Sequence, residues 1–152
     1  RDSSTSRGLG DVYKRQLDDC VNFVSGVPDE RIVELYSEAE LACVPSLYEG
    51  FSLPAIEAMS CGAPLVCTPG GALPEVTGTH GETCFQTEPG NSDALAATIR
   101  EALDNPELRA KVGAAGRERV KSQWSWRNTA IKTVDQYRAM LDEHAARVNG
   151  AG

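Results

Sequence analysis

Residues 41–71, "LACVPSLYEGFSLPAIEAMSCGAPLVCTPGG", decide the fold of this chain. Two short apolar runs, 41–44 and 64–67, stand on either side of a helical segment at 53–60. Continuous apolar runs of this length are typical of parallel strands that are covered on both faces. Pro54 suits the first turn of the helix between them. The segment therefore predicts a β-α-β unit.

The same alternation extends outward from this unit. We expect strands at 21–24 and 81–85, and a helix capped by Asp29 before residue 41. Three further helices follow. We expect one to be capped by Ser92, one to begin at Asn105-Pro106, and one to run from about Ser125 to near His144. The order predicts an α/β fold, a Rossmann-like parallel sheet with helices on both faces, followed by C-terminal helices.

The two ends of the chain do not share this pattern. Residues 1–16, "RDSSTSRGLGDVYKRQ", are polar and have no apolar period, and they resemble a translated sequencing-adapter read. We interpret them as a non-native or disordered tail. The remaining chain is then a partial domain at 17–145 with a disordered tail at 146–152, and we expect the native protein to continue upstream of Leu17.

Composition narrows the classes of function. The net charge of −7 argues against nucleic-acid binding, which needs clustered Lys and Arg, but it leaves small anionic ligands open. No run of about 18 apolar residues and no signal-peptide pattern is present, so we expect a cytoplasmic protein. Peripheral association of the whole protein with the inner face of the membrane stays open. His80 and His144 are expected at the surface, and no metal site is expected.

The five cysteines include no C-x-x-C pair. Three of them, Cys43, Cys67 and Cys84, lie in or beside apolar segments, so buried reduced thiols are the expected state.

The loop at 45–52 leaves a strand at its carboxyl end, where ligands bind in sheets of this kind. Backbone N–H groups in this loop would surround a helix N-terminus, which favours a phosphate or a sugar hydroxyl. These groups belong to Gly50, Phe51, Ser52 and Leu53. A second glycine turn follows the next strand, formed by Gly70 and Gly71 with Glu75 further along.

Glu49 and Glu57 stand eight positions apart in this region. A glycosidase pair needs carboxyl groups about 5 to 9.5 Å apart, whereas eight helical residues span roughly 12 Å. A bend at Gly50 could shorten that distance, so spacing alone does not decide. A carboxylate in the second turn of a strand-end helix suits the diol of a ribose better. Two solvated surface glutamates are the alternative for such a pair in isolation.

The string "FVSGVPDERIVELYSEAELACVPSLYEGFSLPAIEAMSCGAPLVCTPGGALPEV" resembles the nucleotide-binding domain of retaining glycosyltransferases of family 4. These are the group 1 glycosyltransferases with the GT-B fold, and Glu49 and Glu57 match their E-x7-E motif. The resemblance covers about residues 21–137. It implies the C-terminal half of a GT-B enzyme.

The resemblance implies roles for several residues. Glu57 would bind the ribose hydroxyls of a nucleotide sugar, and Glu49 would be the catalytic carboxylate beside the donor sugar. Ser52 departs from the glycine most common at its position, which would narrow the space around the donor. The backbone would hold the sugar and diphosphate at Gly50, Phe51, Ser52 and Leu53. The nucleobase would lie against the loop of Gly26, Val27 and Pro28, and the cleft would be lined by Gly70, Gly71 and Glu75.

The implied activity is transfer of a sugar, by a hexosyltransferase-type enzyme, from a UDP-, GDP- or ADP-linked donor. The acceptor would be a sugar, a lipid or a small molecule, and no metal or cofactor is needed. The family's upstream Arg and Lys and its acceptor domain cannot be located here, and Lys14 and Arg15 lie in the tail. We therefore expect this chain alone to bind donor without transferring it. A non-catalytic nucleotide-binding module and a GT-B sugar-nucleotide epimerase stay open as alternatives.

The last expected helix resembles the family's segment that crosses back to the acceptor domain. Its apolar stripe is then expected to be exposed in this chain, and consists of Trp126, Ala130, Val134, Tyr137 and Leu141.

Overall fold

The computed structural model describes residues 20–149, so the predictions for residues 1–16 and 150–152 lie outside its described part. The chain divides into two compact units, one ending at Ile32 and one beginning at Val33. Each unit is described by itself below.

In the first unit, the predicted strand at 21–24 is absent, and this prediction was wrong. Val21, Phe23 and Val24 are exposed, and no strand pairs with them in the described part of the chain. An apolar run forms a strand only where a neighbouring strand completes its hydrogen bonds. Helix α2 begins at Asp29 itself and ends at Glu38, so Asp29 is its first residue and not its cap. Its residues from Val33 onward belong to the second unit.

The second unit contains a parallel sheet of three strands in the order β1-β2-β3. The strands are β1 (Ala42–Val44), β2 (Leu65–Cys67) and β3 (Phe85–Gln86). β3 is shorter than predicted because residues 81–83 form a turn before it. The predicted β-α-β unit is confirmed, with α3 at Leu53–Ser60 between β1 and β2.

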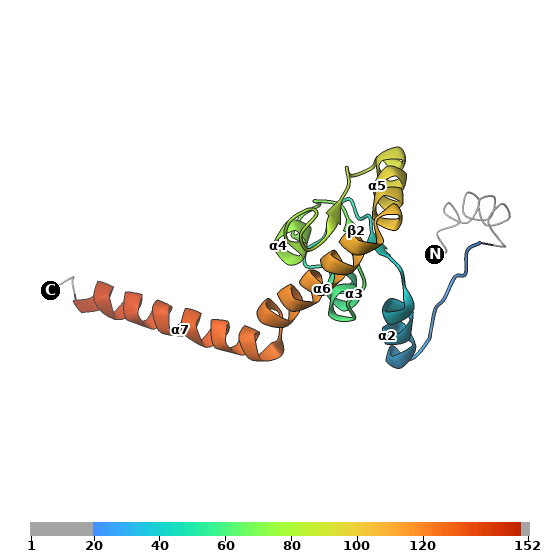
Figure 1. Ribbon diagram of the computed structural model, residues 1–152. Coiled ribbons are helices and arrows are strands. Elements are labelled where there is room, and N and C mark those ends of the chain that lie inside the picture. Colours follow the sequence, from blue (N-terminus) through green and yellow to red (C-terminus); the bar gives the residue numbers. More distant parts are fainter. Residues whose placement is uncertain (1–19, 150–152) are drawn as a thin grey trace, which may run out of the picture. The chain divides into compact units, whose positions relative to one another are not determined.

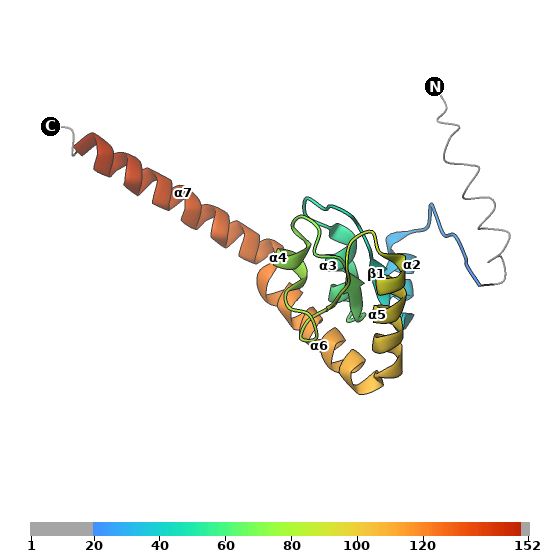
Figure 2. The ribbon, with the colours of Figure 1, turned by 90° about the horizontal axis from the view of Figure 1, so that it is seen from above.

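Helices cover both faces of the sheet, as predicted (Figures 1 and 2). One face packs against α3, α4 (Leu73–Thr77) and the C-terminal part of α6 (Pro106–Gln123). The other packs against α5 (Ser92–Asp104) and the start of α6. The core on the first side includes Met59, Leu65, Leu73, Val76 and Val120, and that on the second includes Val66, Phe85, Ala102 and Val112.

Three local predictions need correction. Cys43 is exposed, whereas Cys67 and Cys84 are buried free thiols as expected. β1 is at one side of the sheet in the described residues, and only Ala42 and Val44 face the core. The cap of α5 is Asn91, whose Oδ1 accepts the N–H groups of Asp93 and Ala94 at 3.1 and 3.0 Å, and not Ser92. Helix α4 was not predicted.

Helix α7 runs from Trp126 to Asn149, so it continues through 146–149, which we assigned to the tail. No Gly or Pro interrupts the helix before Gly150. Its apolar stripe is exposed, with Trp126 at 89% and Leu141 at 69% exposure.

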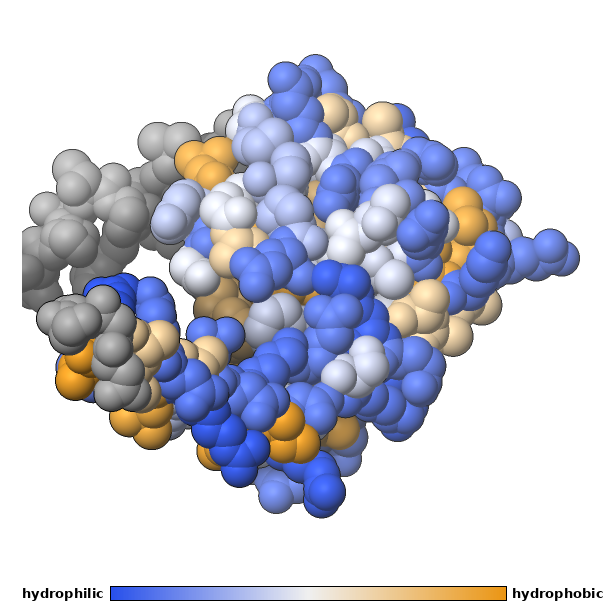
Figure 3. Space-filling view, turned by 90° about the vertical axis from the view of Figure 1, so that its left-hand side faces the viewer, coloured by the Kyte–Doolittle hydropathy of each residue, from blue (hydrophilic) through white to orange (hydrophobic). Residues whose placement is uncertain are grey.

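One face of the molecule is mostly hydrophilic with separate apolar patches (Figure 3). In residues 20–149, no helix has the length and apolar character needed to cross a membrane.

Candidate functional site

The loop between β1 and α3 lies at the carboxyl end of β1 and carries the half-buried Glu49. Glu57 lies in the second turn of α3 and is exposed. The structure thus places both glutamates on one loop-helix unit, as the sequence predicted.

Glu49 is fixed by hydrogen bonds at its side chain and at its backbone. The Ser46 hydroxyl donates to Glu49 Oε1 at 2.7 Å. The Ala72 amide donates to the Glu49 carbonyl at 2.8 Å. The loop after β1 is therefore tied to the turn after β2.

The glycine pair packs directly against this loop. A Cβ at Gly70 would lie 2.6 Å from the Leu47 carbonyl oxygen, and a Cβ at Gly71 would lie 3.0 Å from the Glu49 nitrogen. Gly71 also has φ +61°, in the left-handed region that favours glycine. The geometry gives the pair a role in shaping the loop. Glu75 lies in the first turn of the five-residue α4 and is exposed.

Ser52 is the N-cap of α3 and adopts φ 56° and ψ 78°, in the left-handed region. This conformation is strained for serine but not for glycine, which explains why glycine would suit this position. Ser52 is 4% exposed, and its Oγ has no hydrogen-bond partner in the described part of the chain. Its side chain does not cap the helix. No side chain therefore caps the start of α3, and N–H groups at a helix N-terminus can bind an anionic or hydroxyl-bearing ligand.

An apolar pocket lies beside the start of α3. Phe51 packs edge-on against Trp124, with ring centroids 5.2 Å apart. The pocket has a volume of about 290 Å³ and is lined by Phe51, Leu53, Ile56, Trp124, Trp126 and Thr129. The Trp124 indole N–H is buried without a partner among the described residues. Trp124 and Trp126 were not predicted as site residues.

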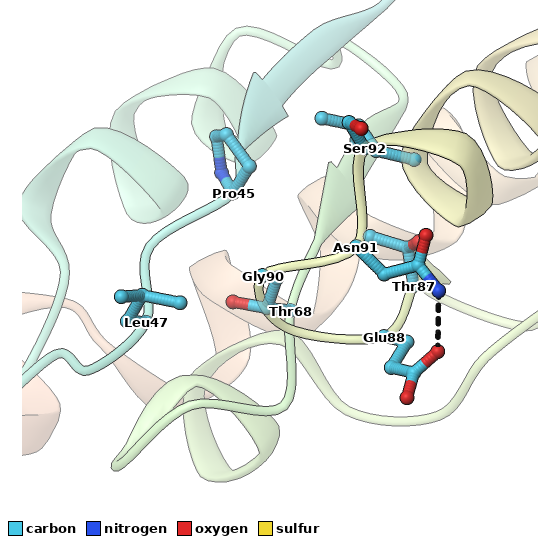
Figure 4. Close-up of a pocket in the computed structure, with 9 residues that line it drawn as sticks. Pro45, Leu47, Thr68, Thr87, Glu88, Gly90, Asn91 and Ser92 are labelled. Carbon is cyan, nitrogen blue, oxygen red and sulfur yellow. Dashed lines mark hydrogen bonds between the residues drawn. The ribbon is translucent and has the colours of Figure 1, made fainter.

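A second pocket of about 280 Å³ opens at the carboxyl ends of the strands (Figure 4). Thr68 and Thr87 directly follow β2 and β3 and line it together with Pro45 and Leu47 of the loop. Both threonines are buried. Neither threonine was predicted as a site residue, although a position directly after a strand is a signal for one.

Glu57 also acts on a neighbouring side chain. Burial first, and then the negative charges of Glu57 and Cys61, raise the pKa of Tyr36 above its ordinary value. Glu57 is therefore close enough to Tyr36 of α2 for its carboxylate to disfavour the phenolate.

The loop that we expect to lie against the nucleobase, residues 26–28, belongs to the first unit. Gly26 has φ +66°, Val27 is half-buried, and the Pro28 carbonyl accepts the Arg31 amide at 3.0 Å. The role of this loop stays a prediction.

Comparison with known sequences finds one family over most of the chain. Residues 10–119 match the family model described as "Glycosyl transferases group 1". The chain is 43% identical over 130 residues to the MMP alpha-(1->4)-mannosyltransferase of Mycolicibacterium hassiacum, covering 86% of this chain and 32% of that protein. It is 38% identical to the O-antigen chain mannosyltransferase B of Escherichia coli, covering 79% and 30%. The chain thus spans about a third of the length of these relatives.

Solved structures share the fold. The sucrose-phosphate synthase of Thermosynechococcus elongatus superimposes with a TM-score of 0.78 at 35% identity, covering 89% of this chain and 34% of that one. The C-terminal domain of the group 1 family protein LpcC from Francisella tularensis gives 0.66 at 22% identity, covering 78% and 63%. Anabaena HepE, solved in complex with UDP-glucose, gives 0.73 at 22% identity, covering 88% and 38%.

Proposed function

This chain belongs to the group 1 glycosyl transferases, and we propose that it forms the donor-binding domain of a retaining glycosyltransferase. In this proposal the whole protein transfers a hexosyl group from a nucleotide sugar to an acceptor. The observation that carries it is the unit at 45–60, where a tethered carboxylate precedes a helix whose N-terminus has no side-chain cap.

The proposed roles follow from the charges that develop during transfer. As the glycosidic bond breaks, the sugar carbon gains positive charge and the diphosphate gains negative charge. The carboxylate of Glu49 would stabilise the first charge and hold sugar hydroxyls. The N–H groups at the start of α3 would stabilise the second without having to reorient.

Glu57 would accept hydrogen bonds from the ribose hydroxyls. It is exposed in the second turn of α3, one turn beyond the N–H groups assigned to the diphosphate. A carboxylate in that position suits a vicinal diol. The nucleoside would then extend past α3 while the sugar lies beside the 45–52 loop.

The names of the relatives support a hexosyl donor. Two of them are mannosyltransferases, and the HepE structure contains UDP-glucose. We keep the donor base open among uracil, guanine and adenine.

The remaining part of the whole protein would hold the acceptor, a sugar, a lipid or a small molecule. We propose that the exposed stripe of α7 packs against that part, since 45–89% exposure of large apolar side chains such as Val134 and Trp126 is costly in water. This chain by itself would accordingly bind donor but transfer nothing.

Titration of the 152-residue chain with UDP, GDP and ADP, followed by amide NMR shifts, tests the proposal. We expect weak binding of at least one nucleotide and weaker binding in Glu57→Ala. Glu101→Ala, which removes an exposed glutamate from α5, is the matched control. Binding of none of the three nucleotides would overturn the donor-binding role. A full-length version that releases only epimerised sugar would overturn the transferase role.

A further inference from the structure

The hydroxyl groups of Thr68 and Ser46 form a relay of two hydrogen bonds that connects the end of β2 to Glu49. The Thr68 hydroxyl donates to the Ser46 carbonyl, and the Ser46 hydroxyl donates to Glu49 Oε1 at 2.7 Å. We propose that Ser46 and Thr68 are positioning residues, which hold the Glu49 carboxylate in the orientation that receives the donor sugar. This inference rests on the proposed function.

The relay begins at a rigid part of the fold. Val44 and Cys67 are paired in the parallel register of β1 and β2, and Thr68 directly follows that pair. Thr68 is 2% exposed and lines the strand-end pocket together with Pro45 and Leu47 (Figure 4). Its hydroxyl therefore has a fixed place from which to hold the backbone of Ser46.

The loop has little else to hold it. Leu47 and Tyr48, between Ser46 and Glu49, are 71% and 77% exposed, so hydrophobic burial contributes little to their position. The contacts that fix residues 46–49 of the loop are polar or backbone contacts. They comprise the relay, the bond from Ala72 to the Glu49 carbonyl, and the close packing of Gly70 and Gly71.

The relay also determines which carboxylate oxygen is available. Oε1 of Glu49 accepts the Ser46 hydroxyl, and in the described residues Oε2 accepts no hydrogen bond. Oε2 can therefore receive a sugar hydroxyl while Oε1 keeps the side chain in one rotamer. A side chain ordered before binding loses less conformational entropy when the ligand arrives.

The experiment compares a nucleotide with its hexose conjugate. The full 152-residue chain is titrated with UDP and UDP-glucose, GDP and GDP-mannose, and ADP and ADP-glucose, and the pair that binds best is used. Ser46→Ala is expected to weaken binding of the hexose conjugate on the order of tenfold, which is the effect of losing one hydrogen bond to a charged group. Binding of the free nucleotide is expected to stay unchanged. Ser46→Thr, which keeps a hydroxyl, is expected to rescue binding. Ser37→Ala, in an exposed turn of α2, is the matched control.

Thr68 is tested by a second pair of variants. Thr68→Val is also expected to weaken binding of the hexose conjugate, and Thr68→Ser, which keeps the hydroxyl, is expected to bind it like the wild type. Amide spectra report whether each variant folds. Unchanged conjugate binding in a folded Thr68→Val would overturn the role of Thr68. If Thr68→Val does not fold, the Ser46 variants decide whether the inference stands.

A double-mutant cycle separates positioning from a general structural role. In a Glu49→Ala background, Ser46→Ala is expected to cause no further loss of conjugate affinity. Equal weakening of nucleotide and conjugate by Ser46→Ala, or a further loss in that background, would overturn the inference. So would unchanged conjugate binding in Ser46→Ala when Glu49→Ala does weaken it. If Glu49→Ala itself leaves conjugate binding unchanged, the proposed role of Glu49 fails and this inference fails with it.

Discussion

The Ala72 amide donates a 2.8 Å hydrogen bond to the Glu49 carbonyl, and Gly71 makes this approach possible. A Cβ at Gly71 would overlap the Glu49 backbone, since it would lie 3.0 Å from its nitrogen and 3.1 Å from its carbonyl carbon. Two loops that follow neighbouring strands are therefore in backbone contact beside the candidate catalytic carboxylate. A side chain at position 71 would have to separate them.

Gly71→Ala is accordingly expected to lower the free energy of unfolding by about 2 kcal/mol or more, from left-handed strain and overlap together. Urea denaturation followed by tryptophan fluorescence measures the loss. Gly81→Ala is the matched control, because Gly81 has φ +75° and a Cβ added there would meet nothing within 4 Å. In Gly81→Ala the free energy of unfolding should fall only by the cost of left-handed strain, about 1 kcal/mol. Equal losses in the two variants would contradict the close packing.

Ser52→Gly is expected to stabilise the chain by about 0.5–1 kcal/mol, because glycine adopts φ 56° without strain and removes an unpaired buried hydroxyl. Thermal and urea unfolding measure the change. Ser60→Gly, at the other end of α3, should lower stability by a similar amount because its backbone is helical. A less stable Ser52→Gly would indicate that the Ser52 hydroxyl has a partner.

The β-α-β unit could be predicted from the sequence because its signals are local. The apolar runs, Pro54 and the E-x7-E string lie within thirty-one residues, 41–71, and both α3 and the family resemblance are confirmed. The strand at 21–24 was predicted from a short, β-rich run, but a run of residues does not show whether a partner strand exists. Cys43 was misplaced for a related reason, because burial of each face of a strand depends on which helices lie over it.

Some residues of the candidate site could likewise be predicted from the sequence, and others could not. Glu49 and Glu57 carry a spacing that the sequence displays, and their roles stay predictions. Ser46 and Thr68 are 22 residues apart, and their contact depends on the register of β1 and β2. The left-handed conformation of Ser52 likewise depends on how α3 leaves the loop. A single sequence contains no direct signal for such tertiary relationships.

The stripe on α7 predicts self-association of the isolated chain. Large apolar side chains there are exposed, with Tyr137 at 64% and Leu141 at 69%. Sedimentation velocity is expected to show mass increasing with protein concentration, and Tyr137→Ser combined with Leu141→Ser should reduce it. Arg138→Ser combined with Asp142→Ser is the control, since it changes neighbouring exposed polar residues and conserves net charge. An unchanged mass distribution in the apolar variant would exclude this stripe as the contact.

The proximity of Glu57 to Tyr36 predicts a pH dependence. Burial, and after it the Glu57 carboxylate, raise the pKa of Tyr36 above 10.0, so the folded chain favours the neutral phenol. This contribution to stability is fully present below pH 10.0 and is lost as the pH rises through the raised folded-state pKa. Glu57→Gln removes one cause, so the pKa of Tyr36 should fall towards its ordinary value and the alkaline loss of stability should shrink.

Carbon NMR of the Tyr36 ring across the alkaline range measures that pKa, and Tyr36→Phe assigns the signal. Glu38→Gln, an exposed glutamate of α2, is the control and should leave the titration unchanged. Because burial remains the larger cause, the pKa in Glu57→Gln should stay above 10.0. The same titration repeated with saturating nucleotide adds a test of the site. Ribose hydroxyls bound to Glu57 would change the electrostatic field of its carboxylate at Tyr36, and therefore the pKa of Tyr36. A Tyr36 titration that responds to neither the substitution nor the nucleotide would place Glu57 away from both partners.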